Sequence, residues 1–152
     1  MANQDPQPEL YTTRHSFTGA SATAGDTSVQ TVFTNQANNE EVRIYAVMVS
    51  ILDQNDAEAA VGTADVNFAL TIGVGSNNVP SNQFDITAIQ YKDDKTLSFP
   101  CPILVLFQQP LTISVELSST AGATLAANRT VVITLISELA IQKLPEFRRG
   151  RR

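Results

Sequence analysis

The amino-acid sequence predicts an all-β fold: a single antiparallel β-sandwich of about eight strands, jelly-roll-like, with extended N- and C-terminal arms. Three observations lead to this prediction. Apolar and polar residues alternate with a period of two over long stretches, most clearly between Leu97 and Ile141, and this pattern is typical of strands that bury one face. No segment shows the 3.6-residue period of an amphipathic helix. A chain of 152 residues also fits one sandwich domain in length.

The two clearest strands lie in the last third of the chain. Leucine, isoleucine and valine occupy every second position from Leu111 to Leu117, and a longer alternating run extends from Arg129 to Ile141. A polar loop that contains Gly122 separates the two runs. We therefore expect these two strands to form a hairpin around which the rest of the sandwich assembles.

Shorter runs of the same kind predict the other strands. The predicted strands begin near Leu10, Thr27, Val42, Val66, Gln83, Ile103, Leu111 and Asn128, with Leu97–Phe99 as an additional short strand. The run Val42–Leu52 is apolar at most positions and rich in β-branched residues, which favours a strand covered on both sides over a buried helix. A long connection is predicted over Asp53–Ala64. The Cys–Trp–Cys hallmark of an immunoglobulin-type sandwich is absent, since the chain has no tryptophan.

Two prolines interrupt the apolar run that follows. Pro100 and Pro102 flank Cys101 and separate the short predicted strands Leu97–Phe99 and Ile103–Phe107. Proline has no amide hydrogen to donate to a neighbouring strand, so this split is expected at a strand start, a bulge or a sheet edge. Cys101 itself is expected to be a small buried hydrophobe.

Charge is distributed unevenly along the chain. The net charge is −5, but the last ten residues hold five basic side chains and one acidic one, so they carry +4 and residues 1–142 carry −9. We divide the chain into an N-terminal arm over residues 1–9, a β-sandwich domain over residues 10–142 and a basic C-terminal tail over residues 143–152.

The candidate partner-binding residues all lie in this tail: Phe147, Arg148, Arg149, Arg151 and Arg152. Three interpretations remain open. The tail docks on an acidic protein groove through charge-assisted hydrogen bonds, binds phosphate groups, or serves as a solubilising end. The acidic body repels phosphate, so nucleic acid is expected to bind through the tail alone.

No set of residues points to catalysis, a cofactor or a metal. The chain has one histidine, His15, and one cysteine, Cys101, far apart in the sequence. This disfavours a nucleophile–base pair and excludes zinc-finger spacing and an intramolecular disulfide. The acidic loop Asp53–Glu58 fails the EF-hand pattern and is better interpreted as a solvated loop. We therefore expect a protein that is not an enzyme and holds no cofactor.

The composition favours contact with other proteins. The first ten residues are polar and acidic, unlike a secretory signal, and no apolar run is long enough to cross a bilayer. We therefore expect a chain made in a cytoplasm, with no membrane partner. Charged residues make up 16% of the chain, below the usual value of about 25%, and such surfaces are suited to extensive protein contact.

One pattern in the last third of the chain resembles a known class of proteins. Phe99-Pro100-Cys101-Pro102-Ile103 is followed by the alternating run Leu111–Leu117 and by the long strand Arg129–Leu139. This arrangement resembles β-sandwich virion proteins of tailed phages and other bacterial or archaeal viruses, namely capsid decoration, minor capsid and head-fibre or spike-base proteins. The chain departs from the pattern at Ser137–Ala140, where a glycine often closes the last strand.

The resemblance implies a structural role without catalysis. It implies a virion protein, made in the host cytoplasm, that docks on neighbouring subunits through its terminal arms. Its partners are then other virion or capsid proteins and copies of itself, with a trimer favoured. The alternative is a carbohydrate- or receptor-binding β-sandwich of a viral fibre, spike or adhesin, suggested by the asparagine-rich loops Asn35–Asn39 and Gly75–Asn82. An enzyme on a jelly-roll scaffold, such as a cupin, is disfavoured because its metal needs several histidines.

Overall fold

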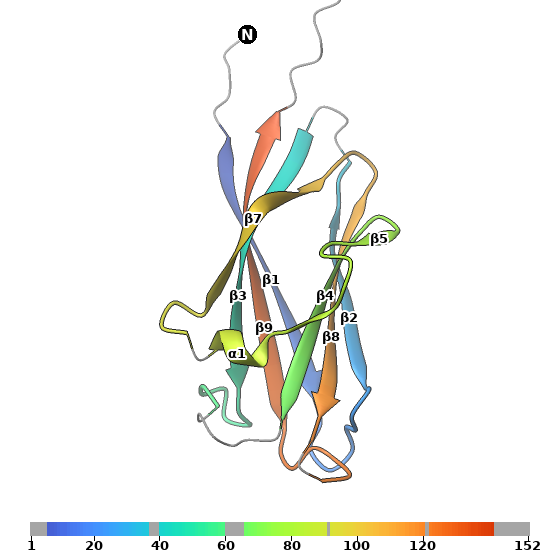
Figure 1. The fold of residues 1–152 in the computed structure, drawn as a ribbon, viewed down its shortest axis with the longest axis vertical. Helices are drawn as coiled ribbons and strands as arrows, with labels where there is room; N and C mark the ends of the chain where they lie inside the picture. Colours follow the sequence, from blue (N-terminus) through green and yellow to red (C-terminus); the bar gives the residue numbers. More distant parts are fainter. Residues whose placement is uncertain (1–5, 37–39, 60–65, 91, 121, 142–152) are drawn as a thin grey trace, which may run out of the picture.

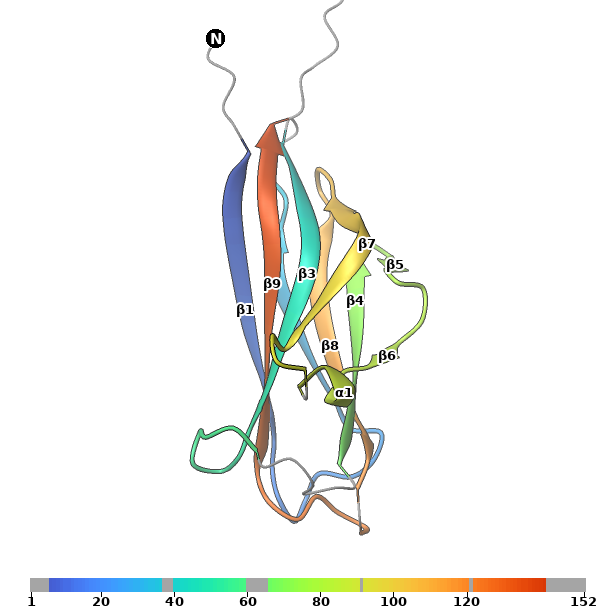
Figure 2. The same ribbon diagram turned by 60° about the vertical axis from the view of Figure 1, so that its left-hand side comes forward.

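The computed structural model describes residues 6–36, 40–59, 66–90, 92–120 and 122–141. Two antiparallel sheets pack face to face in it, which confirms the predicted β-sandwich (Figures 1 and 2). Sheet A contains, in spatial order, β1 (Gln7–Phe17), β9 (Arg129–Ile141), β3 (Glu40–Leu52) and β7 (Thr96–Val105). Sheet B contains β2 (Thr27–Thr34), β8 (Pro110–Ser119), β4 (Asn67–Val74) and β5 (Asn77–Asn78), and β6 (Phe84–Asp85) also pairs with β4.

The strand pairing is nested along the chain. β1 pairs with β9, β2 with β8, β3 with β7, and β4 with β5 and β6. The first strand therefore lies beside the last, the second beside the last but one, and so on inward. A long antiparallel ribbon folded over in this way gives a double-sheet jelly roll. The jelly-roll-like prediction is confirmed.

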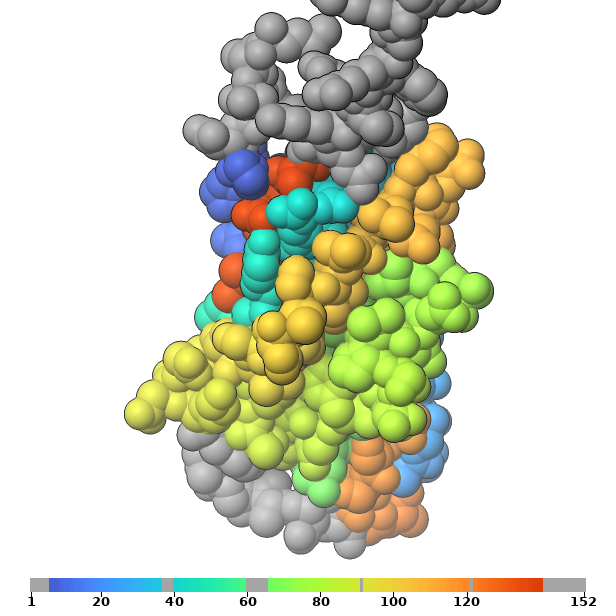
Figure 3. All heavy atoms as spheres, turned by 45° about the horizontal axis from the view of Figure 1, so that its top comes forward, coloured from blue at the N-terminus to red at the C-terminus, as the bar shows by residue number. Residues whose placement is uncertain are grey.

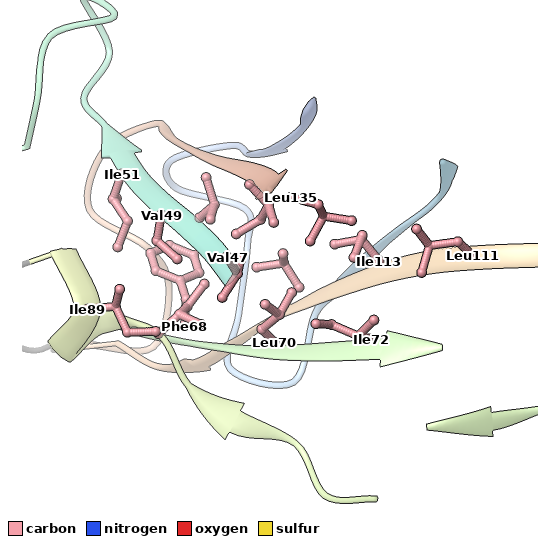
Figure 4. Close-up of a cluster of buried hydrophobic side chains, with 14 of the residues drawn as sticks. Val47, Val49, Ile51, Phe68, Leu70, Ile72, Ile89, Leu111, Ile113 and Leu135 are labelled. Atoms are coloured by element: carbon pink, nitrogen blue, oxygen red, sulfur yellow. The ribbon is translucent and has the colours of Figure 1, made fainter. Parts of the chain in front are cut away.

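The core lies between the two sheets and follows the predicted alternation. On β8 the predicted inward positions are 0% exposed, and on β9 they are at most 1% exposed up to Leu135. Figure 4 shows side chains from β3, β4, β8 and β9 pointing into this space, with one from the short helix beside them: Val47, Val49, Ile51, Phe68, Leu70, Ile72, Leu111, Ile113, Leu135 and Ile89. Burial of each such side chain stabilises the fold by about 1.5–3 kcal/mol.

The two clearest strands do not form a hairpin, contrary to the prediction. β8 pairs with β2 and β4, whereas β9 pairs with β1 and β3 in the other sheet. Residues 122–128, before β9, lie across the end of the core instead, and Leu125 among them is 1% exposed. The amide of Leu125 donates to the carbonyl of Ala22 and its carbonyl accepts from the amide of Ala20. Alternation of apolar and polar residues indicates that one face of a strand is buried, but it does not indicate which other strand pairs with it.

The strand predicted over Gln83–Tyr91 is wrong for most of its length. Only β6 is extended there, and it is followed by the helix α1 (Thr87–Gln90). The carboxylate of Asp85 accepts from the amide of Thr87 at 2.8 Å, as at a helix start. Ile86 and Ile89, three residues apart, are both buried. α1 packs against β3, β4 and β7 and closes one open side of the sandwich. Tyr91 lies outside the described residues.

Two further strands differ from their predictions. β3 is not covered on both faces by described residues, since Tyr45 and Met48 are each 38% exposed. A register shift between Ile44 and Ala46 breaks its alternation, which is why consecutive residues there are buried. The prolines do not divide β7, which runs continuously along the edge of sheet A opposite that shift, in agreement with the edge or bulge predicted for them.

The sandwich begins earlier than the boundary drawn from the sequence. Residues Gln7–Glu9, which we assigned to the arm, pair with Ser137–Leu139 of β9. Within the described residues, no helix is long and apolar enough to span a membrane.

Candidate interaction surfaces

Both ends of the described chain lie at one end of sheet A. Gln7 of β1 pairs with Leu139 of β9, and Glu40 of β3 pairs with Ile141. Figure 3 shows this end turned forward, with the first residues of β1 in blue, the last of β9 in red and the first of β3 in cyan. We name it the arm end. The tail candidates all follow β9 and lie outside the described residues: Phe147, Arg148, Arg149, Arg151 and Arg152.

An apolar turn stands at the same end. Leu104, Leu106 and Phe107, which we name the apolar turn, are 44%, 40% and 43% exposed. They lie at the arm end because Val105 pairs with Val42, near the start of β3. In Figure 3 this part of the chain is orange and stands beside the start of β3, on the side away from β1.

The apolar turn is held by polar contacts around it. The amide of Leu106 donates to the side-chain oxygen of Gln109 at 2.9 Å, and the amide of Gln109 donates to the carbonyl of Leu106 at 3.1 Å. The amide of Gln108 donates to the carbonyl of Asn35 at 2.8 Å, and the side-chain amide of Asn35 donates to the carbonyl of Val105 at 3.2 Å. These bonds fix the backbone of the apolar turn.

A charged cluster borders the arm end on the outer face of sheet A. Arg43 forms ion pairs with Glu41 and, at 3.4 Å, with Glu138, and the hydroxyl of Tyr45 donates to Glu138. The hydrogen bond to Glu138 raises the pKa of Tyr45, and that to Glu41 raises the pKa of Arg43. Two carboxylates around one guanidinium leave this cluster with one surplus negative charge.

Among the described residues of the strands, the outer face of sheet A carries no charge across its middle. Two rows of paired residues cross all four strands, Leu10–Ile136–Ala46–Ser98 and Thr12–Thr134–Met48–Thr96. Together with Tyr45 and Val132 they form what we name the neutral face. Figure 2 shows β1, β9 and β3 side by side on this side of the molecule. Charge returns at its borders, with the Glu138 cluster at one end and Arg14, 3.1 Å from Asp56, at the other. At the β7 edge, Lys92 donates to the carbonyl of Thr96 at 2.7 Å and Asp94 accepts from the amide of Thr96 at 3.2 Å.

A small hollow lies at the opposite end from the arms, between the end of β1 and the start of β2. Its volume is about 300 Å³ and it is lined mostly by hydroxyl groups: Ser16, Phe17, Thr18, Ser21, Ala22, Asp26, Thr27 and Ser28. One carboxylate oxygen of Asp26 accepts from the amide of Thr23 at 2.9 Å. The hollow therefore offers hydroxyl groups and one carboxylate to a small polar ligand.

The histidine and the cysteine lie on opposite edge strands of sheet A, β1 and β7. His15 is 0% exposed, and burial lowers its pKa although a hydrogen bond to the backbone of Ser28 opposes that effect. Cys101 is exposed, contrary to the expected buried hydrophobe. It lies between prolines on an edge strand with no described strand beyond it. The structure does not bring the two residues together.

The acidic loop binds protein groups rather than converging on one point. The carboxylate of Asp53 accepts from the amides of Asn55 and Ala57 at 2.8 and 3.1 Å. Asp56 pairs with Arg14, and Glu58 pairs with Lys95. Among the described residues, no group of three or more His, Cys, Asp and Glu side chains is placed to hold a metal.

The sequence analysis did not single out the apolar turn or the neutral face. The run Ile103–Phe107 is apolar at consecutive positions, so its side chains point to both faces of the strand, and an edge strand of a sandwich buries only one of them. This pattern could have indicated the exposed apolar turn. The neutral face needs the strand order, which joins residues from four separate segments. No family model, curated protein or solved structure matches this chain.

Proposed function

We propose that this protein is a non-enzymatic virion structural protein, a capsid decoration or minor capsid component that docks on neighbouring subunits through its arm end. The observation that carries the proposal is the meeting of three features at that end. The start of β1, the end of β9 and the apolar turn all lie there. A docking surface needs an apolar anchor with polar groups around it, and this end supplies both.

The chemistry of the tail complements the apolar turn. Leu106 and Phe107 can bury apolar area against a neighbour, at about 25 cal/mol per Å². Arg148, Arg149, Arg151 and Arg152 can form charge-assisted, bidentate hydrogen bonds with carboxylates on the same neighbour, with Phe147 as a second apolar contact. Phosphate groups are the other ligand of this tail, and binding to them would weaken steeply with added salt.

The fold supports this proposal only in general terms. Double-sheet jelly rolls occur in viral capsid proteins, lectins and cupins, and a fold alone does not decide between them. The arm end favours the first of these classes. Capsid neighbours in a shell are repeated at fixed spacing, so a rigid sandwich with its docking groups at one end fits such a site.

The proposal is tested by occupancy on particles. Particles are purified from cells that carry the viral genome encoding this chain, and the bound protein is quantified by mass spectrometry. Deletion of residues 148–152, and separately the double change Leu106→Ser and Phe107→Ser, are each expected to lower occupancy at least tenfold. Val29→Ser is the matched control, because Val29 is 64% exposed on β2, away from the arm end. Full occupancy of both variants would refute docking through the arm end.

A second candidate function is carbohydrate binding in the hollow beside β1 and β2. Its hydroxyl groups and the carboxylate of Asp26 could hydrogen-bond to sugar hydroxyls, as in lectins of this fold class. A glycan array with the wild-type chain and with Asp26→Asn tests it. Glycan binding by the wild type that is lost in Asp26→Asn would support this function, and no binding of the wild type to any glycan would refute it.

A further inference from the structure

We propose that the neutral face of sheet A packs against the neutral face of a second copy of this chain, across a two-fold axis that lies between the faces and perpendicular to the strands. The inference concerns the side of the sandwich rather than its arm end. It stands independently of the virion role, because a dimer could form whether or not the arm end docks elsewhere.

The first argument is the chemistry of the neutral face. Leu10 is 67% exposed, and Tyr45 and Met48 are each 38% exposed, on one continuous sheet surface. The paired rows place threonine and serine around them and no charged side chain between them. The outer face of sheet B differs, because its central positions present hydroxyl groups such as Ser114 and Thr71 and it bears Glu116. Apolar groups with small hydroxyls suit a buried contact.

The second argument is that the neutral face is compatible with itself. The chain carries a net charge of −5, so two copies repel one another when their charged surfaces meet. Contact through the neutral face brings together the surfaces on which this repulsion is smallest. Two aligned sheets pack about 10 Å apart, and side chains as small as threonine allow that approach.

The third argument is area. Four strands about 4.8 Å apart, crossed by the two neutral rows and by the border rows of Glu138 and Arg14, all about 6.7 Å apart, make a face of about 500 Å² on each copy. Two copies therefore bury about 1,000 Å², which reaches the size at which specific interfaces begin. A pair held this way is expected to exchange with monomer at low concentration rather than to be permanent.

The charges at the two borders fix the direction of the axis. The carboxylate of Glu138, in the cluster with the surplus negative charge, lies at the arm-end border, and Arg14, which pairs with the exposed Asp56, lies at the other. An axis perpendicular to the strands brings Arg14 of one copy over the arm-end border of the other, beside its Glu138. An axis along the strands would instead place Glu138 against Glu138. Arg14 pairs with Val132 of β9, six residues from Glu138, so the two side chains of one copy are about 20 Å apart and cannot pair.

This geometry has a consequence for assembly. The strands of the two copies run in opposite directions, so the two arm ends point away from each other. The pair therefore keeps both apolar turns exposed and presents two identical docking ends. A single copy has one such end, whereas the pair could bridge two neighbours.

The first test measures the mass of the full chain by sedimentation velocity over a range of micromolar concentrations. The wild type is expected to shift from a 16.4 kDa monomer towards a dimer as concentration rises. Thr134→Arg, at the centre of the neutral face, is expected to raise the dissociation constant at least tenfold. Ser114→Arg is the matched control, on the outer face of the central strand β8 in sheet B, and is expected to dimerise as the wild type does. A wild type that stays monomeric, or forms a trimer, would overturn the proposal.

The second test uses charge exchange to check the axis. Arg14→Glu sets a new carboxylate against Glu138 of the second copy, and Glu138→Arg sets a new guanidinium against its Arg14, so each single change is expected to weaken dimerisation severalfold. The double variant restores one opposite-charge pair at each border and is expected to dimerise within twofold of the wild type. Each variant is compared in thermal unfolding as a monomer to exclude loss of the fold. Additive weakening in the double variant would rule out the proposed axis.

Discussion

The Nδ1 atom of His15 lies 3.1 Å from the carbonyl oxygen of Ser28, and this contact joins the edge strands of the two sheets, β1 and β2. Nδ1 is also 3.1 Å from the hydroxyl of Ser28, and Nε2 is 3.0 Å from the hydroxyl of Thr13. A carbonyl can only accept, so Nδ1 carries the proton and Nε2 accepts from Thr13. The imidazole is neutral and 0% exposed in this arrangement.

The first prediction is that acid weakens the sandwich through His15. Burial lowers the pKa of His15 below its usual value of 6.5, so on acidification His15 binds a proton at a higher pH in the unfolded chain than in the folded chain. The free energy of unfolding is therefore expected to fall as the pH drops below about 6.5 and through the lower pKa of the folded state. Urea unfolding measured between about pH 8 and pH 5 checks this, a range that lies above most carboxylate titration.

His15→Gln is the control for the same measurement. Glutamine keeps a donor and an acceptor but does not titrate, so the variant is expected to be less stable at pH 8 and nearly independent of pH down to about 5. An unchanged slope in this variant would show that other groups cause the acid sensitivity.

The second prediction concerns the close approach of Gly73 to Thr112. A methyl group added at Gly73 would collide with the hydroxyl of Thr112 on the neighbouring strand β8. Gly73→Ala is therefore expected to lower the free energy of unfolding by about 1–3 kcal/mol. In a Thr112→Ala background the same change is expected to be neutral or stabilising. Gly122→Ala, whose added methyl has only one contact, at 4.0 Å, is the control and is expected to gain up to about 1 kcal/mol.

The third prediction separates the two faces of β9 at adjacent positions. Leu135 is 1% exposed and points into the core, whereas Ile136 lies on the neutral face. Leu135→Ala is expected to cost about 2–5 kcal/mol in unfolding free energy. Ile136→Ala is expected to cost about 1 kcal/mol or less in the dilute monomer while weakening dimerisation. Denaturant unfolding at low and high protein concentration measures both; equal losses at low concentration would contradict this assignment of faces.

The residues that bury one face are those that the sequence located best. β9 has the bounds and β8 the inward positions that alternation predicts, because each faces the core with every second side chain. β2 has the predicted bounds but not the predicted burial, since Val29 is 64% exposed and the register shifts between Thr31 and Phe33. Pairing could not be predicted in the same way. Leu117 and Val131 both point into the core, yet they lie in opposite sheets, and no local property of either residue distinguishes these cases.

Two local features of the structure account for the other differences between the predicted and the observed strands. Phe84, Ile86 and Ala88 fit the alternation of a strand, but the bond from the amide of Thr87 to Asp85 starts a helical turn that buries Ile86 and Ile89 together. Tyr45 is the extra residue at the register shift in β3, and the two residues after it, Ala46 and Val47, are both buried although they point to opposite faces. The sequence of a strand with one open face therefore resembles that of a strand covered on both. The candidate surfaces depend on strand order, so only the tail could be chosen beforehand.

The last prediction follows from the exposure of Cys101. The thiol lies on the edge strand β7 between two prolines, and proline has no amide hydrogen to donate to another strand that would cover that edge. A maleimide reagent is therefore expected to label the native protein completely, with one label per chain and without urea. Cys101→Ser should take up none. If labelling instead requires urea and follows the unfolding curve, the thiol is covered in solution, and the edge of sheet A must be occupied by residues beyond those described or by another copy.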